Sequence, residues 1–316
     1  MDKYLLGIDI GGTTVKIGLF NNLGELLDKW EIETRKIENG KYILSDITKS
    51  INEILEDRNI SKDEVLGAGV GVPGPVKDDG TVLGCVNLGW SVFNVSTQLE
   101  KLLHIPIRVA NDANIAALGE MYKGGGKGYK NVIMVTLGTG VGGGVIVNGK
   151  IVAGATGSGG EIGHINVNPH EKVSCNCGRK GCLEQYTSAI GIVRLAHEIL
   201  ERENLDSRLR NIENITSKDV FDLAKDNDQL SLKVIEKFSS ILGRALSNIA
   251  CICNPQAFIV GGGVSNAGDI LLDNIKKYYF KNSFFAIDDT DIKLAILGND
   301  AGIFGGAKLA QEILFE

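Results

Sequence analysis

The sequence predicts an α/β chain made of two halves that share one plan. Runs rich in Val, Ile and Leu are mixed along the chain with stretches of helical periodicity, the pattern of strands and helices in one domain. The chain has 41 glycines in 316 residues, about 13% against a usual ~7%. Most of them gather directly after the apolar runs, where turns at strand ends need them.

The repeated unit is a β-hairpin. Its two copies occupy strands 4–10 and 15–20, and strands 132–137 and 145–147. Glycine turns join the strands of each copy, and turn residues (Asn22-Leu-Gly24 and Asn148-Gly149) follow each copy. Aligning Asp9 with Thr136 superposes Gly11 on Gly138, which indicates an internal repeat.

Helical periodicity and apolar runs place the remaining elements. We expect helices at about 41–58, 94–103, 112–122, 183–202, 217–225, 231–252, 266–280 and 301–315, and strands near 65–72, 107–110, 257–261 and 292–297. The charged, weakly periodic stretch 203–216 is expected to be a loop or an insertion.

Composition excludes several classes of protein. The formal net charge is −6 and no long basic run is present, so a surface that binds duplex DNA is not expected. The longest apolar runs are far shorter than the roughly 20 residues that cross a bilayer, and the first residues do not have the pattern of a signal peptide. We therefore expect a cytoplasmic protein with no nucleic-acid or membrane partner.

The first motif with chemical meaning is Asp9-Ile-Gly11-Gly12-Thr13-Thr-Val-Lys16. Glycines let the backbone approach a phosphate, successive N–H groups form an anion-binding concavity, and the preceding carboxylate can hold magnesium or its waters. The alternative is a plain hairpin turn with a solvated lysine. The combination of Asp, Gly-Gly, Thr and Lys at a strand end favours the phosphate site.

The second motif, Gly138-Thr139-Gly140-Val-Gly-Gly143, formally matches the dinucleotide-binding fingerprint. That fingerprint requires a helix after the glycines, whereas Val145-Ile-Val-Asn-Gly predicts a strand and a turn. We therefore predict a second phosphate-binding hairpin. A P-loop sequence is also absent.

The third glycine motif is Gly261-Gly262-Gly263, between a predicted strand and a predicted helix. The glycines leave room for an adenosine. A simple tight turn is an equally good interpretation of this motif taken alone.

A metal site is predicted by His164 together with Cys175, Cys177 and Cys182. Three thiolates and one imidazole satisfy tetrahedral zinc and leave no open position, so the metal would organise a loop. His170 remains an alternative fourth ligand, and buried thiols without a metal remain another interpretation.

The pair Asn111-Asp112 lies where a predicted strand meets a predicted helix. An Asp at this place is often only the helix N-cap. The functional alternative is a general base aimed at a substrate hydroxyl, which in phosphoryl transfer needs only a weak base.

Taken together, these motifs resemble those of the ROK family of sugar kinases, and within it most of all the bacterial glucokinases. The resemblance runs from Asp9-Ile-Gly-Gly-Thr through Asn111-Asp-Ala-Asn and Glu161-Ile-Gly-His to Cys175-x-Cys-Gly-x-x-Gly-Cys and Gly261-Gly-Gly. It implies an actin/hexokinase-type (ribonuclease H-like) duplicated fold, whose two domains flank an active-site cleft. One departure is the interval from His164 to Cys175, which is a residue longer than is common and keeps the His170 alternative open.

The resemblance also implies roles for individual residues. Asp112 is the expected catalytic base, and Asn111, Glu161, His164 and Glu184 are expected to bind the sugar, with His164 also on the structural zinc. ATP and Mg²⁺ are the expected cofactors. The residues expected to bind them are Asp9, Gly11, Gly12, Thr13, Lys16, Gly138, Thr139, Gly140, Gly261, Gly262 and Gly263.

The expected domains are 1–115 plus 301–316, and 116–300. The expected reaction is ATP-dependent phosphorylation of glucose at its 6-hydroxyl, in a dimer or tetramer. A kinase for N-acetylmannosamine or another hexose, a different phosphoryl donor, and a catalytically silent sugar-binding protein remain alternatives. The DNA-binding repressors of the family carry an additional domain before the motif at Asp9, for which eight residues leave no room.

Overall fold

The computed structural model describes residues 3–287 and 289–315, and the chain divides into two compact units. Unit 1 comprises Met1–Lys130, Gly144–Gly160 and Leu297–Glu316, and unit 2 comprises Asn131–Gly143 and Glu161–Ile296. The predicted domain boundaries at 115/116 and 300/301 stay a prediction.

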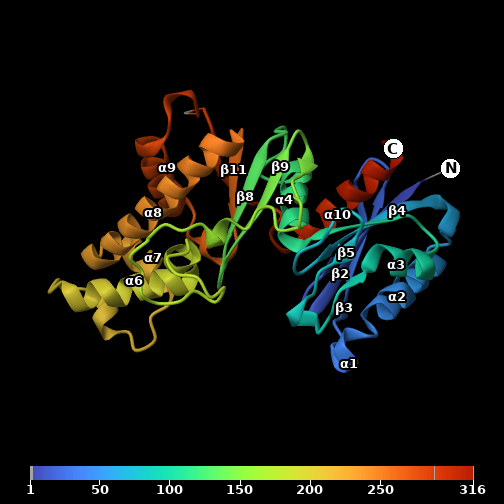
Figure 1. Cartoon of the computed structure of the whole chain (residues 1–316), viewed down its shortest axis with the longest axis horizontal. Coiled ribbons are helices and arrows are strands. Elements are labelled where there is room, and N and C mark those ends of the chain that lie inside the picture. Colours follow the sequence, from blue (N-terminus) through green and yellow to red (C-terminus); the bar gives the residue numbers. More distant parts are fainter. Residues whose placement is uncertain (1–2, 288, 316) are drawn as a thin grey trace. The chain divides into compact units, whose positions relative to one another are not determined.

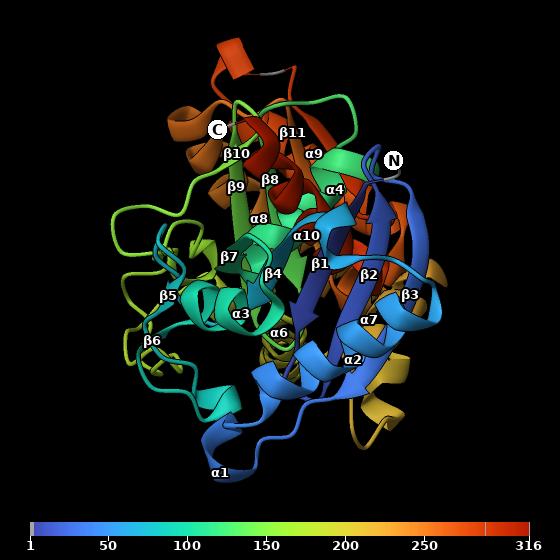
Figure 2. The ribbon, with the colours of Figure 1, turned by 90° about the vertical axis from the view of Figure 1, so that its right-hand side faces the viewer.

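The first sheet has the strand order β3-β2-β1-β4-β7. Figure 1 labels β2, β3 and β4 of this sheet, and Figure 2 labels β1 and β7 as well. Its strands are β1 (Tyr4–Ile10), β2 (Thr14–Asn21), β3 (Leu26–Glu33), β4 (Val65–Val72) and β7 (Ile107–Asn111). Strands β1, β2 and β3 pair antiparallel, β4 runs parallel to β1, and β7 runs parallel to β4. The predicted first hairpin is therefore confirmed.

The second sheet repeats this plan with the order β10-β9-β8-β11-β12. Its strands are β8 (Val132–Leu137), β9 (Val141–Val147), β10 (Lys150–Ile151), β11 (Ala257–Gly261) and β12 (Asp291–Leu294), and a separate small sheet pairs β5 (Thr81–Val82) with β6 (Phe93–Asn94). Asp9 lies opposite Gly71 on β4, and Thr136 lies opposite Gly261 on β11. The predicted alignment of Asp9 with Thr136 is thus confirmed, and with it the duplicated α/β fold.

The helices are α1 (Ile37–Gly40), α2 (Ile43–Asp57), α3 (Val95–Leu103), α4 (Asp112–Lys123), α5 (Glu184–Thr187), α6 (Ala189–Arg202), α7 (Ser217–Lys225), α8 (Gln229–Cys253), α9 (Asp269–Asn282) and α10 (Ala301–Gln311). The prediction of one helix over 183–202 is wrong. Ser188 adopts an extended conformation and its side chain accepts a hydrogen bond from the backbone N–H of Gly191, so it caps α6 and separates it from α5.

Alternation along β1 sends its side chains to both faces of the first sheet. Leu6 and Ile8 belong to the buried cluster under α2 and α3. Figure 2 shows these two helices in front of the strands. Leu5 belongs to a smaller cluster that includes Ile303 of α10. Gly7 faces α10 as well, and a Cβ there would lie 1.9 Å from the backbone oxygen of Ile303. The helix therefore packs directly on the strand backbone.

The sequence analysis did not predict β3 or the first half of β9. Strand β3 alternates half-buried and exposed residues, so it has no continuous apolar run. The start of β9 contains Gly142, Gly143 and Gly144, which resemble a turn in sequence. A Cβ at Gly144 would lie 2.7 Å from the backbone oxygen of Ala113, so this glycine allows α4 to approach the strand.

Among the residues that the structure describes, no helix combines the length and the apolar character needed to cross a membrane.

Candidate active site

The junction of β7 and α4 holds the expected catalytic carboxylate. Asn111 is the N-cap of α4, because its Oδ1 accepts hydrogen bonds from the N–H groups of Ala113 at 3.0 Å and Asn114 at 3.1 Å. Its side-chain amide donates to Asp112 Oδ1 at 2.9 Å and to the backbone oxygen of Gly74 at 3.1 Å. The alternative in which Asp112 is itself the cap is therefore wrong.

Asp112 is the first residue of α4, and its Oδ1 also accepts from the N–H of Ala113 at 2.8 Å. Two donors on one oxygen fix the orientation of the carboxylate. The N-terminus of a helix also favours a negative charge at this place. The arrangement presents an oriented carboxylate, which suits a general base.

Asp9, at the end of β1, lies close enough to Asp112 for the two charges to interact. Burial of Asp9 and the negative charge of Asp112 raise the pKa of Asp9 to about 6, although Lys16 opposes the shift. Two carboxylates that repel each other in a partly desolvated place form a setting that a divalent cation stabilises. The residues present in unit 1 therefore fit Mg²⁺ at this end of β1.

The turn after β1 is open on the side of its glycines. The N–H of Gly11 bonds to the oxygen of Thr14 at 3.0 Å, and a Cβ at Gly12 would meet no atom within 4 Å. Thr13 is exposed. Lys16 pairs in register with Asp9, and its Nζ donates to the backbone oxygen of Asn299 at 3.1 Å. The structure therefore places Lys16 beside the carboxylate and gives it a partner in the short 3-10 turn just before α10.

In unit 2, the two remaining glycine motifs adjoin each other. The N–H of Gly138 bonds to the oxygen of Gly140 at 2.9 Å in the turn from β8 to β9, and Thr139 lies between them. Gly262, with φ of +83°, packs on Leu137, since a Cβ there would lie 2.5 Å from its backbone oxygen. The strand β9 follows the turn, so the rejection of a dinucleotide-binding fingerprint is confirmed.

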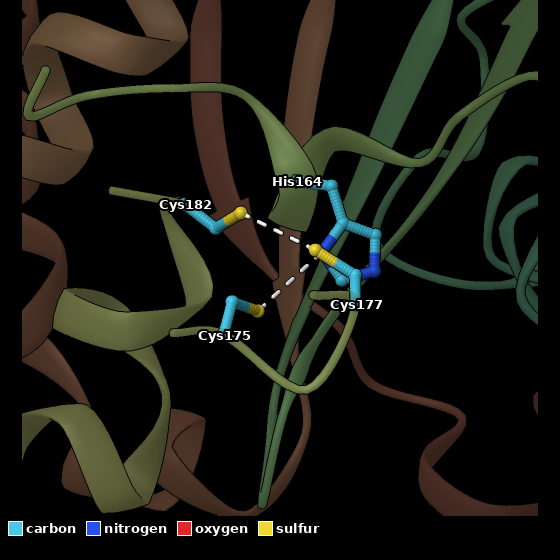
Figure 3. Close-up of side chains that lie close together, drawn as sticks. All are labelled: His164, Cys175, Cys177 and Cys182. Carbon is cyan, nitrogen blue, oxygen red and sulfur yellow. Dashed lines mark hydrogen bonds between the residues drawn. The ribbon is translucent and has the colours of Figure 1, made fainter. Parts of the chain in front are cut away.

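His164, Cys175, Cys177 and Cys182 come together in unit 2, with their ligand atoms all within 4.8 Å of one another (Figure 3). The sulfurs of Cys177 and Cys182 are 3.6 Å apart, and His164 Nδ1 is 3.9 Å from the sulfur of Cys175. Tetrahedral zinc with bonds of about 2.3 Å would place two sulfurs about 3.8 Å apart. The donor set and its spacing therefore fit zinc. In the described part of the chain, His170 does not belong to this group.

The thiols of this cluster differ in pKa. Burial and hydrogen bonds with its two neighbouring thiols raise the pKa of Cys182 to about 12. A hydrogen bond from the backbone of Arg179 lowers the pKa of Cys177 to about 7. A zinc ion would favour the thiolate form of all three side chains.

Glu184, the first residue of α5, joins the cluster of His164 and the three cysteines to the glycine turn. One carboxylate oxygen accepts from the N–H of Val141 at 2.9 Å, and the other lies 3.7 Å from the sulfur of Cys175. A Cβ at Gly140 would lie 2.3 Å from this carboxylate. Glu161 is exposed and precedes the short 3-10 turn that ends at His164.

Sequence reasoning missed Glu120, which lies in α4 and is fully buried. Its two oxygens accept from the N–H groups of Gly125 and Leu297, each at 2.8 Å. Leu297 is 177 residues away, so no local pattern could have paired them. The signal available in the sequence was a carboxylate within an apolar stretch of a predicted helix.

Comparisons with known proteins agree with the motifs. The sequence model of the ROK family matches residues 5–313. A glucokinase from Halalkalibacterium halodurans is 42% identical over 318 residues, which cover 98% of this chain and 96% of that protein. A glucokinase from Thermotoga maritima is 34% identical, with 98% and 97% of the two chains covered.

One solved structure is a ROK family glucokinase from Streptomyces griseus in complex with glucose and AMPPNP. It is 32% identical to this chain, with a TM-score of 0.74, and the match covers 98% of this chain and 99% of that one.

Proposed function

Because this chain belongs to the ROK family over nearly its whole length, we propose that it phosphorylates glucose at the 6-hydroxyl with ATP as donor. Its fold is of the actin/hexokinase type, as in the related sugar kinases. The glucokinase relatives support the substrate. The observation that carries the proposal for the mechanism is the carboxylate of Asp112, oriented by Asn111 at the start of α4.

Asp112 accepts the proton of the sugar hydroxyl while the oxygen of that hydroxyl attacks the γ-phosphorus of ATP. The bond between the γ-phosphorus and the bridging oxygen of ADP breaks in the same step, in line with the attack. Asn111 keeps the carboxylate in place throughout, since it bonds both to Asp112 and to the first turn of the helix. Most of the rate enhancement then comes from positioning and charge.

Glu161, His164 and Glu184 bind the sugar hydroxyls in this proposal, together with Asn111. Cys175, Cys177, Cys182 and Nδ1 of His164 would hold a structural zinc ion, which would fix the loop that presents these side chains. The second nitrogen of the His164 ring is then available for the sugar. The contact of Glu184 with both Cys175 and Val141 supports this arrangement, because it ties a sugar-binding residue to the zinc loop.

The glycines at 11–12, 138–140 and 261–263, with Thr13, Thr139 and Lys16, bind the nucleotide in this proposal. ATP would bring Mg²⁺, which Asp9 would help to hold. When bound, the ion would supply positive charge to the phosphates. The raised pKa of Asp9 supports a cation at this position, since a cation would relieve its repulsion by Asp112.

The proposal is tested by a coupled assay of ADP release with Mg²⁺-ATP, using glucose, N-acetylmannosamine, N-acetylglucosamine and fructose. Glucose is expected to give the highest kcat/KM. Asp112→Asn is expected to lower kcat by a factor of about 10²–10⁴, whereas Asp63→Asn, at an exposed position, serves as the control and keeps full activity.

A preference for an N-acetylated sugar would retain the mechanism and change the substrate. Absence of turnover on every sugar would overturn the kinase proposal in favour of a silent sugar-binding protein. An Asp112→Asn variant with wild-type kcat would contradict the role of Asp112 as base.

A further inference from the structure

Unit 2 contains a cavity of about 490 Å³ outside the candidate active site. Its walls are α6, α8 and the segment 167–172 that follows the 3-10 turn at His164, and buried Leu195 and Ile241 contribute apolar surface. A volume of this size lies in the range of small-molecule pockets. We call it the basic cavity because of the side chains Lys172, Arg202, Lys237 and Arg244 that line it.

The charges around the basic cavity do not balance. Both of its carboxylates, Glu171 and Glu198, are ion-paired with the same Arg194. Within residues 3–287 and 289–315, the four basic side chains that define the cavity make no ion pair or hydrogen bond. Other exposed cations of unit 2 do have partners, as in Lys233 with Glu203 and Lys218 with Asp222. Four basic side chains without a partner thus line one concave place, in a chain whose net charge is −6.

The helices present these cations toward one another. Lys237 and Arg244 are seven residues apart on α8, so they share one face about 10 Å apart, with Ile241 between them. Arg202 comes from α6, on the other wall. Guanidinium groups bind phosphate oxygens in pairs, and an ammonium group adds a compact charge.

We propose that the basic cavity binds the phosphate group of a small phosphorylated metabolite, such as a sugar phosphate. Arg202, Lys237 and Arg244 contact the phosphate, and the apolar surface from Leu195 and Ile241 accommodates the body of the ligand. A concave site of this volume favours a small molecule over a nucleic acid, which would need an extended basic surface.

The segment 167–172 gives such a ligand a route to the zinc loop. The N–H of Val167 donates to the oxygen of Gly181 at 2.7 Å, next to Cys182. Glu171 accepts hydrogen bonds from Tyr186 and Arg194, and Tyr186 follows Glu184 by two residues. A ligand against Lys172 therefore touches the chain between His164 and Cys175. On the proposed function, its binding changes the KM for glucose more than the KM for ATP.

The test is isothermal titration calorimetry of the zinc-loaded protein with inorganic phosphate and with glucose 6-phosphate. Glucose and AMPPNP are present in excess, so that the active site is filled. The variant R202Q/K237Q/R244Q is compared with K218Q/K225Q/K276Q, which removes the same charge from unit 2 outside the cavity. We expect one binding site in the wild type and in the control, and binding about tenfold or more weaker in the cavity variant.

Binding should also weaken as salt is raised, because exposed charges are screened. Phosphate alone binding as tightly as glucose 6-phosphate would identify a site for the phosphate group only, with no role for the apolar wall. No binding to the wild type, or equal binding to both triple variants, would overturn the proposal. These titrations need no catalysis. If no sugar is phosphorylated, the proposed kinase function fails, but the titrations still test the proposal that the basic cavity binds phosphate.

Discussion

Gly302 lies at the start of α10, where the helix passes the carboxylate of Asp9. A Cβ at this position would lie 2.4 Å from Asp9 Oδ2 and 2.5 Å from its Cγ. The carboxylate of Asp9 therefore occupies space that a side chain at position 302 would fill. A single methyl group would move the carboxylate that we propose to orient magnesium.

We expect Gly302→Ala to raise the concentration of Mg²⁺ needed for half-maximal activity by about tenfold or more, because displacement of one oriented charge by an ångström is costly in phosphoryl transfer. Magnesium titration of the initial rate at saturating glucose and ATP measures this. Asp9→Asn is the comparison, because it removes the charge without moving the helix. An unchanged magnesium dependence in Gly302→Ala would show that α10 yields to the new methyl group.

The stability of the fold at low pH depends in part on the hydrogen-bonded carboxylate of Glu171. Its side chain is 7% exposed. Burial acts to raise its pKa, but hydrogen bonds from Tyr186 and Arg194 outweigh burial and lower the pKa to about 2, from an ordinary value of 4.5. Since the folded pKa is the lower one, the ionised group stabilises the fold above pH 4.5, and this contribution is lost as the pH falls toward 2.

Glu171→Gln is therefore expected to lower the melting temperature at pH 7 and to lower it progressively less between pH 4.5 and pH 2. Thermal unfolding followed by circular dichroism at a series of pH values measures the difference between wild type and variant. The zinc that we propose at the neighbouring cluster would be lost from both proteins at low pH, so its loss cancels in this difference. A difference that stays constant with pH would mean that the Glu171 carboxylate keeps the same protonation in the folded and unfolded chain.

At the residue scale, the sequence could predict the side chains whose partners are close along the chain. The cysteines at 175, 177 and 182 and the pair Asn111-Asp112 are recognisable because a short spacing carries the chemistry. Glu120 and Gly302 could not be identified in this way. Their partners Leu297 and Asp9 are remote in sequence, and only the packing of α10 brings them together.

At the scale of elements, the same helix α4 has two functions at its two ends. Its first turn carries Asp112, and its last turn carries Glu120 with both oxygens bonded to backbone N–H groups of other segments. The buried carboxylate fixes the end of α4 relative to the segment that enters α10. Because buried N–H groups are costly to leave without an acceptor, this contact stabilises unit 1.

Glu120→Ala is expected to lower the free energy of unfolding by about 2–4 kcal/mol, because two backbone donors lose their acceptor. Urea unfolding followed by fluorescence gives the value. Glu53→Ala is the matched control, because Glu53 is exposed and its ion-pair partner is Lys49 on α2, which predicts a change of about 0.5 kcal/mol or less. Equal effects of the two substitutions would contradict the role assigned to Glu120.

The elements differ in how well the sequence predicts them. Strands β1, β4, β8 and β11 have the expected bounds, because each is a buried apolar run that ends in glycine or at a predicted turn. The edge strand β3 is half exposed, and β9 begins with glycines, so tertiary pairing decides both. Glycines within strands also serve packing, which the sequence did not predict, as Gly7 of β1 does under α10.

For the whole molecule, the zinc that we propose at His164, Cys175, Cys177 and Cys182 is a feature that a single treatment can remove. We expect a chelator strong enough to remove zinc to raise the KM for glucose more than the KM for ATP, because Glu184 and His164 are both tied to the cluster. Metal analysis and steady-state kinetics before and after chelation measure the effect, and added zinc restores the original values.

Cys182→Ser should copy the chelated state, and Cys251→Ser is the matched control, because Cys251 is an exposed free cysteine outside the cluster. Zinc content and glucose KM that are the same in both variants would contradict a structural zinc at these residues.

The duplication of the fold was predictable because the hairpin repeat is local, and aligning Asp9 with Thr136 was sufficient to find it. The way in which the units divide the chain was not. The chain passes from one unit to the other at 130/131, 143/144, 160/161 and 296/297, and these places carry no linker composition.

This interlaced path has a consequence for a cleaved molecule. A protease cut after Gly160 would leave one fragment that holds β8 and β9 of the second sheet, and another that holds α10, which packs on the first sheet. Each fragment then contains a piece of the core that the other fragment needs. Because neither fragment can complete its core alone, the two fragments would associate as they fold. This chain could therefore be produced as two separate polypeptides that assemble into one working protein.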